Sequence, residues 1–99
     1  MTKAYCVYIV GSGRNGTLYI GATSNLIKRI YQHKMSAVDG FTLRYGVDRL
    51  VWFEQHENAQ AMVTRERQLK EWKRAWKIRL IESGNPDWRD LYGNILGNA

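Results

Sequence analysis

The sequence predicts an α+β fold in which helices flank a small three-stranded antiparallel sheet, in the order β-β-α-β-α-α. Two short runs of β-branched and aromatic residues surround a glycine-rich connection near the N-terminus, and a third such run lies near residue 50. Apolar residues with helical spacing lie between and after these runs. The length of 99 residues fits a single domain over 1–99, with a core over about 4–82 and a C-terminal tail over 83–99.

The first two expected strands form a hairpin. The first covers 5–10 and stops at Gly11, and the second covers 17–20 and ends at Gly21. The connection between them fits no two-residue turn, so the pattern leaves their register open. Both faces of the first strand are apolar or aromatic, and we therefore expect the sheet to be covered on both sides.

A helix follows the hairpin, and a loop follows the helix. Thr23 or Ser24 offers an N-cap, and the helix is expected to continue through about Lys34. Its apolar positions have helical spacing: Leu26, Ile27, Ile30 and Tyr31. Residues 36–40 form the expected loop, and residues 41–45 one short helical turn.

A third strand is expected over 50–54. Asn58 then caps a long helix that ends near Lys73 or Ile81, with a break expected near Ala75 because an unbroken helix would be long for so small a domain. The apolar stripe of this helix consists of Met62, Leu69, Trp72, Trp76 and Leu80.

The C-terminal tail starts where the long helix ends, at residues 83–86, because proline disfavours the helical conformation of the residue before it. Asp87 is expected to cap a last turn that contains Trp88 and Leu91. We expect Trp72, Trp76 and Trp88 to anchor the last helices onto the sheet.

The charge of the chain indicates its partner. Fifteen Lys and Arg residues against nine Asp and Glu give a net charge of +6, which favours phosphate backbones. The excess is concentrated in the long helix, which carries Arg65, Arg67, Lys70, Lys73, Arg74, Lys77 and Arg79. Two acids, Glu66 and Glu71, lie among these bases.

Other classes of protein fit the sequence poorly. The longest apolar run, 4–10, is too short to span a bilayer, and no secretory signal precedes it. The single cysteine, Cys6, forms no intramolecular disulfide and, with two histidines, no zinc constellation. We therefore expect a reduced, cytoplasmic protein without structural metal, membrane partner or small-molecule cofactor.

Glu66 has two interpretations. It lies on the shoulder of the apolar stripe, where an unpaired carboxylate would be costly. It either forms a salt bridge with a base of its own helix or binds a hard divalent cation. One carboxylate suffices for Mg²⁺, because this ion keeps most of its waters and takes phosphate oxygens as further ligands.

Two further pairs of residues could take part in phosphodiester chemistry. Arg29 and His33 lie one helical turn apart, so a guanidinium that binds phosphate would lie near an imidazole that exchanges protons. Two solvated side chains on an exposed flank are the alternative. Tyr8 and Tyr19 lie inside the two hairpin strands, where tyrosines are ordinarily part of the core.

The order of these residues resembles the GIY-YIG nuclease family, in particular its short stand-alone bacterial members. The resemblance rests on Val-Tyr-Ile at 7–9, Leu-Tyr-Ile-Gly at 18–21, Asn-Leu at 25–26 followed by Arg29 and His33, and Glu66 in the basic helix. Two departures are that Cys6 and Val7 precede Tyr8 where the family name has Gly and Ile, and that Ala22 stands where some members have a lysine.

The resemblance implies a role for each matching residue. Tyr8, Tyr19, Arg29 and His33 match catalytic residues, and Glu66 matches the glutamate that holds one Mg²⁺ or Mn²⁺ ion. Asn85 is a possible accessory residue. The basic helix is the expected nucleic-acid-binding surface, through Arg65, Lys70, Lys73, Arg74 and Lys77.

Three functions follow from these features. The first is a metal-dependent endonuclease that hydrolyses DNA and is directed by DNA structure or damage, as in repair or recombination, and the sequence does not exclude RNA. The second is a DNA-binding module of the same fold without turnover. The third is a protein-interaction domain in which Trp72, Trp76 and Trp88 form an aromatic surface. The sequence fixes neither the DNA substrate nor the oligomeric state.

Overall fold

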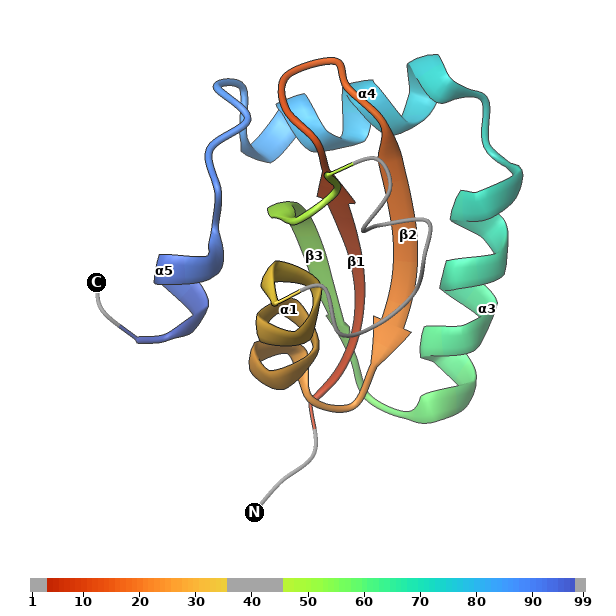
Figure 1. The fold of residues 1–99 in the computed structure, drawn as a ribbon. Coiled ribbons are helices and arrows are strands. Elements are labelled where there is room, and N and C mark those ends of the chain that lie inside the picture. Colours follow the sequence, from red (N-terminus) through yellow and green to blue (C-terminus); the bar gives the residue numbers. More distant parts are fainter. Residues whose placement is uncertain (1–3, 36–45, 98–99) are drawn as a thin grey trace.

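The computed structural model describes residues 4–35 and 46–97, and Figure 1 shows how their elements are arranged. The elements are β1 (Tyr5–Gly11), β2 (Leu18–Thr23), α1 (Leu26–Lys34), β3 (Arg49–His56), α3 (Ala59–Glu71), α4 (Arg74–Gly84) and α5 (Tyr92–Ile95). The predicted α+β class and the order β-β-α-β-α-α are confirmed, with the short α5 added at the end. The helical turn expected over 41–45 lies outside the described residues.

The sheet is antiparallel and has the strand order β2-β1-β3. Tyr8 lies opposite Gly21 of β2 and opposite Phe53 of β3, and Val10 lies opposite Tyr19. Polar groups close the β1–β2 connection: Ser12 donates its N–H to the Thr17 carbonyl at 3.0 Å and accepts the Thr17 N–H on its hydroxyl at 2.9 Å. This closure fixes the hairpin register.

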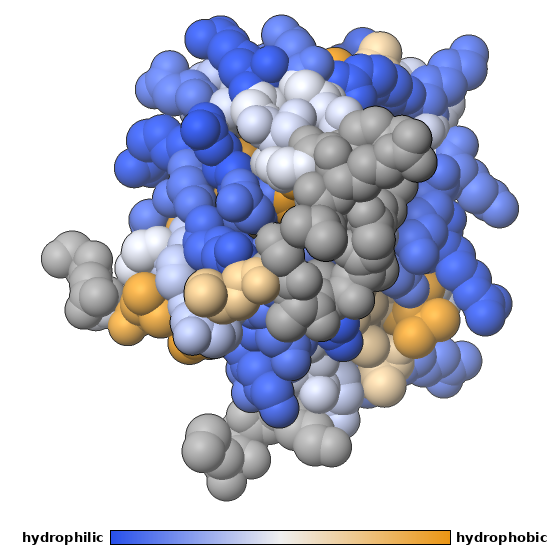
Figure 2. All heavy atoms as spheres, in the orientation of Figure 1, coloured by the Kyte–Doolittle hydropathy of each residue, from blue (hydrophilic) through white to orange (hydrophobic). Residues whose placement is uncertain are grey.

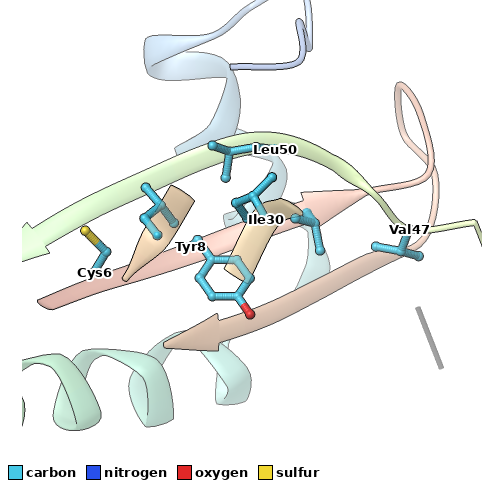
Figure 3. Packing of buried hydrophobic residues seen from close by; sticks show 7 residues of the cluster. Cys6, Tyr8, Ile30, Val47 and Leu50 are labelled. Atoms are coloured by element: carbon cyan, nitrogen blue, oxygen red, sulfur yellow. The ribbon is translucent and has the colours of Figure 1, made fainter. Parts of the chain in front are cut away.

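Both faces of the sheet are covered, as the pattern of β1 predicts. On one face, Cys6, Tyr8 and Val10 pack with Leu26 and Ile30 of α1, and Figure 3 shows part of this cluster. The opposite face is covered by α3 and α4. There Val7, Ile9, Ile20 and Val51 of the strands form a second cluster with Leu69 of α3, Ile81 of α4 and Trp88. Alternation along β1 thus divides the core into two apolar layers.

The junction between β2 and α1 differs from the prediction. β2 does not end at Gly21 but continues to Thr23, because its pairing with β1 extends to the Cys6–Thr23 pair. The N-cap is therefore neither Thr23 nor Ser24 but Asn25, whose Oδ1 accepts the Lys28 N–H at 3.1 Å. The end of α1 at Lys34 agrees with the prediction.

The long helix is capped by Asn58 as predicted, but it breaks earlier than near Ala75. Trp72 and Lys73 both have extended backbone, with ψ of 147°. The break separates α3 from α4, and Arg74 at the start of α4 donates hydrogen bonds to the carbonyls of Asn15 and Gly16 at 2.7 and 2.5 Å. These hydrogen bonds to the β1–β2 connection thus hold the start of α4 in place after the break.

The C-terminal segment also departs from the prediction. α4 ends at Gly84 as expected, but Asp87 does not cap a turn with Trp88 and Leu91. Trp88 has a positive φ of 54° and is completely buried, because its indole fills the apolar layer beneath α4 and donates to Glu82 at 2.6 Å. The last helix begins only at Tyr92, whose N–H donates to Asp90 at 3.1 Å.

Within residues 4–35 and 46–97, the helices are all too short or too polar to cross a membrane.

Gly21 tests the packing of the hairpin against α1. A Cβ added at Gly21 would lie 2.9 Å from Tyr8 Cε1 and still closer to the phenol oxygen, so we expect Gly21→Ala to lower the free energy of unfolding by about 1–3 kcal/mol. Gly84→Ala is the matched control, because a Cβ there meets no atom within 4 Å. Urea denaturation measures both, and equal stability of the two variants would refute the steric role of Gly21.

Candidate active site

A buried hydrogen bond joins the central strand to α1. The Tyr8 hydroxyl lies 2.9 Å from His33 Nε2, and the two residues are only 2% and 3% exposed. Their rings meet edge to face, with centroids 5.5 Å apart. The direction of this bond depends on the tautomer: an unprotonated Nε2 accepts the phenol hydrogen, and a protonated Nε2 donates to the phenol oxygen.

The reason that Tyr8 reaches His33 lies in the neighbouring strand. Tyr8 lies opposite Gly21, and its ring occupies the space that a side chain at Gly21 would fill. Figure 3 shows the Tyr8 hydroxyl oxygen pointing away from Leu50. A glycine inside a strand marks such a close approach of another group, and Gly21 lies inside β2 because this strand continues to Thr23.

Tyr19 completes the cluster around His33. It lies opposite Val10 in β2, and paired residues of adjacent strands point to the same face, so Tyr19 faces α1 as Tyr8 does. Its ring is 5.5 Å from the His33 ring at an interplanar angle of 60°, and it is only partly buried. The structure therefore brings Tyr8, Tyr19 and His33 together.

Arg29 lies one turn before His33 on α1 and is partly buried. It lines a polar hollow of about 220 Å³ at the start of the helix, together with Thr23, Ser24, Asn25, Lys28 and Gln32. Two cations and several hydroxyl and amide groups in one hollow suit an anionic group such as a phosphate. The sequence pattern predicts a role for Arg29 but carries no separate signal for Lys28 or Gln32.

Glu66 comes from the other side of the sheet. It belongs to α3, whose buried Leu69 packs in the layer opposite α1. Viewed along the axis of α3, Arg65 lies about 40° from Leu69 on one side and Glu66 about 60° from it on the other side, because successive residues of a helix are rotated by about 100°. Arg65 donates to Glu54 of β3 at 3.0 Å, so Glu66 faces the other way, toward the edge formed by β2.

Of the two interpretations of Glu66, the structure shows the salt bridge with a base of its own helix. Lys70 Nζ lies 3.2 Å from the Glu66 carboxylate, and the two side chains are 53% and 21% exposed. The structure does not place Glu66 in the cluster of Tyr8, Tyr19 and His33. The carboxylate and these rings share a neighbour, β2, which carries Tyr19 and forms the sheet edge on this side.

The donor set indicates which metal ions could bind. Among residues 4–35 and 46–97, no three His, Cys, Asp or Glu side chains gather into a metal-binding group. Burial raises the pKa of the Cys6 thiol, which disfavours the thiolate that a soft metal needs. A lone, partly buried carboxylate fits a hard ion that keeps its waters, such as Mg²⁺ or Mn²⁺, and does not fit Zn²⁺.

Several of the expected nucleic-acid-binding bases also make contacts within the protein. Arg65 bonds Glu54 and Gln68 and lies over the Trp72 ring, Arg74 bonds the hairpin loop, and Lys73 lies over the Trp76 ring. Lys70 pairs with Glu66, and Lys77 is partly buried. Blue, hydrophilic residues nevertheless dominate the sides of the molecule in Figure 2 where α3 and α4 lie.

Asn85 lies apart from the tyrosine cluster and is 4% exposed. Its Nδ2 donates to the carbonyls of Val51 and Arg89 at 3.1 and 2.9 Å, and its Oδ1 accepts the Arg89 N–H at 3.0 Å. These bonds connect the end of α4 to β3 and to the C-terminal segment. Such an amide stabilises the fold.

Comparisons with known proteins bear on the fold of the chain. The model of the GIY-YIG catalytic domain matches residues 4–79. A UPF0213 protein of Clostridium perfringens is 38% identical over 77 residues, which cover 78% of this chain and 82% of that protein. The solution NMR structure of a UPF0213 protein from Bacillus halodurans matches with a TM-score of 0.55 and 22% identity, over 91% of this chain and 95% of that one. The structural match supports the fold.

The Tyr8–His33 bond is expected to contribute to stability. Tyr8→Phe removes the hydroxyl from a buried imidazole nitrogen and should lower the free energy of unfolding by about 1–3 kcal/mol. Tyr31→Phe is the control, because Tyr31 is 54% exposed and should change stability by less than about 0.5 kcal/mol. Chemical denaturation compares the two, and a Tyr8→Phe variant as stable as the control would contradict the inference.

Asn85 is likewise expected to act on stability. Asn85→Ala leaves three backbone groups without their partner and should cost about 3 kcal/mol. Asn94→Ala, at an exposed position of α5, should have little effect. Thermal unfolding followed by circular dichroism distinguishes them. A normal melt for Asn85→Ala together with lost nuclease activity would instead indicate an accessory role in catalysis.

Proposed function

The chain belongs to the GIY-YIG family of nuclease domains, and we propose on this basis that it is a metal-dependent endonuclease that hydrolyses phosphodiester bonds of DNA. The observation that carries the proposal is the cluster of Tyr8, Tyr19 and His33. All five residues proposed for catalysis and metal binding lie within the matched region, residues 4–79. The enzyme would act on DNA structure or damage, as in repair or recombination, with the basic surface supplying sequence-independent affinity.

The scissile phosphate would bind at the β2 edge. Three features support this location. Tyr19 is on β2, the polar hollow with Arg29 is formed where β2 leads into α1, and the Glu66 flank of α3 faces the same edge. A substrate there could meet the phenol, the guanidinium and the carboxylate, although these groups come from different layers of the fold.

Glu66 would hold one Mg²⁺ or Mn²⁺ ion. When bound, such an ion supplies positive charge to a non-bridging oxygen and to the leaving-group oxygen of the scissile phosphate. Binding requires the Lys70 ammonium to leave the carboxylate, and this exchange is feasible because the Lys70 side chain is 53% exposed and a surface ion pair is worth at most about 1 kcal/mol.

The tyrosines and His33 would handle the proton of the attacking water. A phenol with an ordinary pKa near 10 is a poor base at neutral pH, and histidine is the side chain whose ordinary pKa lies nearest to neutrality. The 2.9 Å hydrogen bond with Tyr8 would orient the His33 imidazole, which would accept the proton of the water and become imidazolium. Tyr19 is less buried than Tyr8 and would orient the water.

Arg29 would stabilise the charge that grows on the phosphate. Its guanidinium can donate two hydrogen bonds to phosphate oxygens, and Lys28 in the same hollow would hold a neighbouring phosphate. Lys70 and Lys77 would contribute long-range attraction for DNA. Arg65 and Arg74 would act mainly by positioning α3 and α4 through Glu54 and the hairpin loop.

One observation favours the second candidate function, a DNA-binding module without turnover. The Glu66–Lys70 ion pair satisfies the carboxylate within its own helix, as it would in a protein that binds no metal. Only the endonuclease yields cleavage products from branched, nicked or single-stranded DNA in the presence of Mg²⁺ or Mn²⁺. DNA binding with a steep salt dependence but without cleavage products would identify the binding module.

The proposed catalytic roles predict a separation of activity from stability. Glu66→Ala and Arg29→Ala should each reduce Mg²⁺-dependent cleavage by at least about 10² to 10³, while the melting temperature stays near that of the unmodified protein. Both side chains retain some exposure to solvent, so truncation leaves no large cavity in the core. Cleavage is measured on branched DNA with Mg²⁺ and with an EDTA control.

Charge-matched controls are available for both variants. Glu57→Ala removes a carboxylate from an exposed position between β3 and α3, and Arg14→Ala removes a guanidinium from the hairpin loop. Both should cleave within about a factor of three of the parent protein. Full activity of purified Glu66→Ala or Arg29→Ala would remove that residue from the mechanism.

A further inference from the structure

A groove of about 430 Å³ lies along α4, away from the candidate active site. It is lined by Trp72, Trp76, Arg79, Leu80 and Ser83. α4 belongs to the layer opposite α1, because its buried Ile81 packs in the second core cluster. The groove is thus separated by the sheet from the Tyr8–His33 pair, and its volume is within the usual range of ligand sites.

The helix break creates the shape of the groove. Trp72 precedes α4 in extended conformation, and its ring meets that of Trp76 at an interplanar angle of 84° with centroids 6.0 Å apart. Trp76, Arg79, Leu80 and Ser83 recur at spacings of three and four, which places them along one side of α4. Trp76 is 45% exposed, a large fraction for a tryptophan.

The surroundings of the groove are cationic. Residues 72–84 contain four bases, Lys73, Arg74, Lys77 and Arg79, and one acid, Glu82. The Glu82 carboxylate accepts a hydrogen bond from the Trp88 indole, so it is directed into the fold. Lys73 Nζ lies over the Trp76 ring, 5.8 Å from its centre, which places an ammonium at one face of the exposed indole. The groove thus combines an aromatic surface with positive charge.

This combination selects among possible occupants. A second copy of the chain would bring another set of bases and a net charge of +6 against the same groove, and like charges repel. A purely apolar partner would leave Arg79 and Lys73 without an acceptor. A single-stranded nucleic acid supplies both an aromatic face for the indole and phosphates for the cations.

We propose that this groove binds an unpaired base of a single-stranded DNA segment, which stacks on the Trp76 indole while Arg79 and Lys73 contact the flanking phosphates. Leu80 and the edge of Trp72 then limit where the base lies. The groove would act as a second DNA contact that favours substrates with an unpaired segment beside the duplex. It binds DNA whether or not the β2 edge hydrolyses it.

The test compares two probes that differ only in their bases. One is an oligothymidylate of about 12 nucleotides, and the other an abasic strand with the same number of phosphates. Affinities are measured by fluorescence anisotropy in EDTA, so that cleavage plays no part. Trp76→Ala should weaken binding of the oligothymidylate roughly 5- to 30-fold and leave the abasic strand nearly unchanged.

Further variants separate stacking from charge and from folding. Trp76→Phe keeps an aromatic ring and should retain most of the affinity while losing the quenching of tryptophan fluorescence by the oligothymidylate. Arg79→Ala should weaken both probes and lower the salt-dependence slope by about one. Tyr31→Ala, an exposed aromatic residue on α1, should bind as the parent protein does.

The proposal is overturned if Trp76→Ala weakens both probes equally or neither. It is also overturned if analytical ultracentrifugation shows a dimer that Trp76→Ala dissolves while oligothymidylate affinity stays constant, because the groove would then be a protein interface. Neither result bears on hydrolysis at the β2 edge, which the Glu66 and Arg29 variants test separately.

Discussion

The contact between Tyr8, Gly21 and His33 links the fold to its candidate chemistry. The Tyr8 ring crosses the space left by Gly21 and ends on the His33 imidazole, so β1, β2 and α1 meet at one point. A buried hydroxyl without a partner would cost about 1–3 kcal/mol, and this bond therefore fixes how α1 sits on the sheet. Any displacement of α1 would move Arg29 together with His33, because both are on that helix.

The central strand β1 separates the two layers of the core. Since β1 is apolar on both faces, it separates α1 with the tyrosines from α3 with Glu66. The salt bridge between Arg65 and Glu54 turns one flank of α3 toward β3, which leaves the flank with Glu66 toward β2. In the proposed mechanism, Glu66 and Tyr19, which come from opposite layers, would meet one substrate at the β2 edge, where the sheet ends.

Local patterns predicted most of the fold, and contacts between distant residues account for the errors. The strands, the Asn58 cap and the end of α4 follow from composition and capping. The break after Glu71 does not, because it depends on Arg74 reaching the carbonyls of the hairpin loop. The hairpin register was likewise hidden, since Ser12 and Thr17 fix it through hydrogen bonds that the turn pattern did not reveal.

The candidate site shows why a core role and a functional role need not exclude each other. As part of the core, Tyr8 is 2% exposed, and its hydroxyl is held 2.9 Å from Nε2 of the equally buried His33. Tyr19, which touches the same imidazole from the edge strand, keeps part of its surface open. In the proposed mechanism, this difference in burial favours different tasks for the two phenols: Tyr8 would hold the imidazole, and Tyr19 would be the phenol that meets the substrate. Sequence spacing cannot make this distinction, because both tyrosines occupy equivalent positions in their motifs.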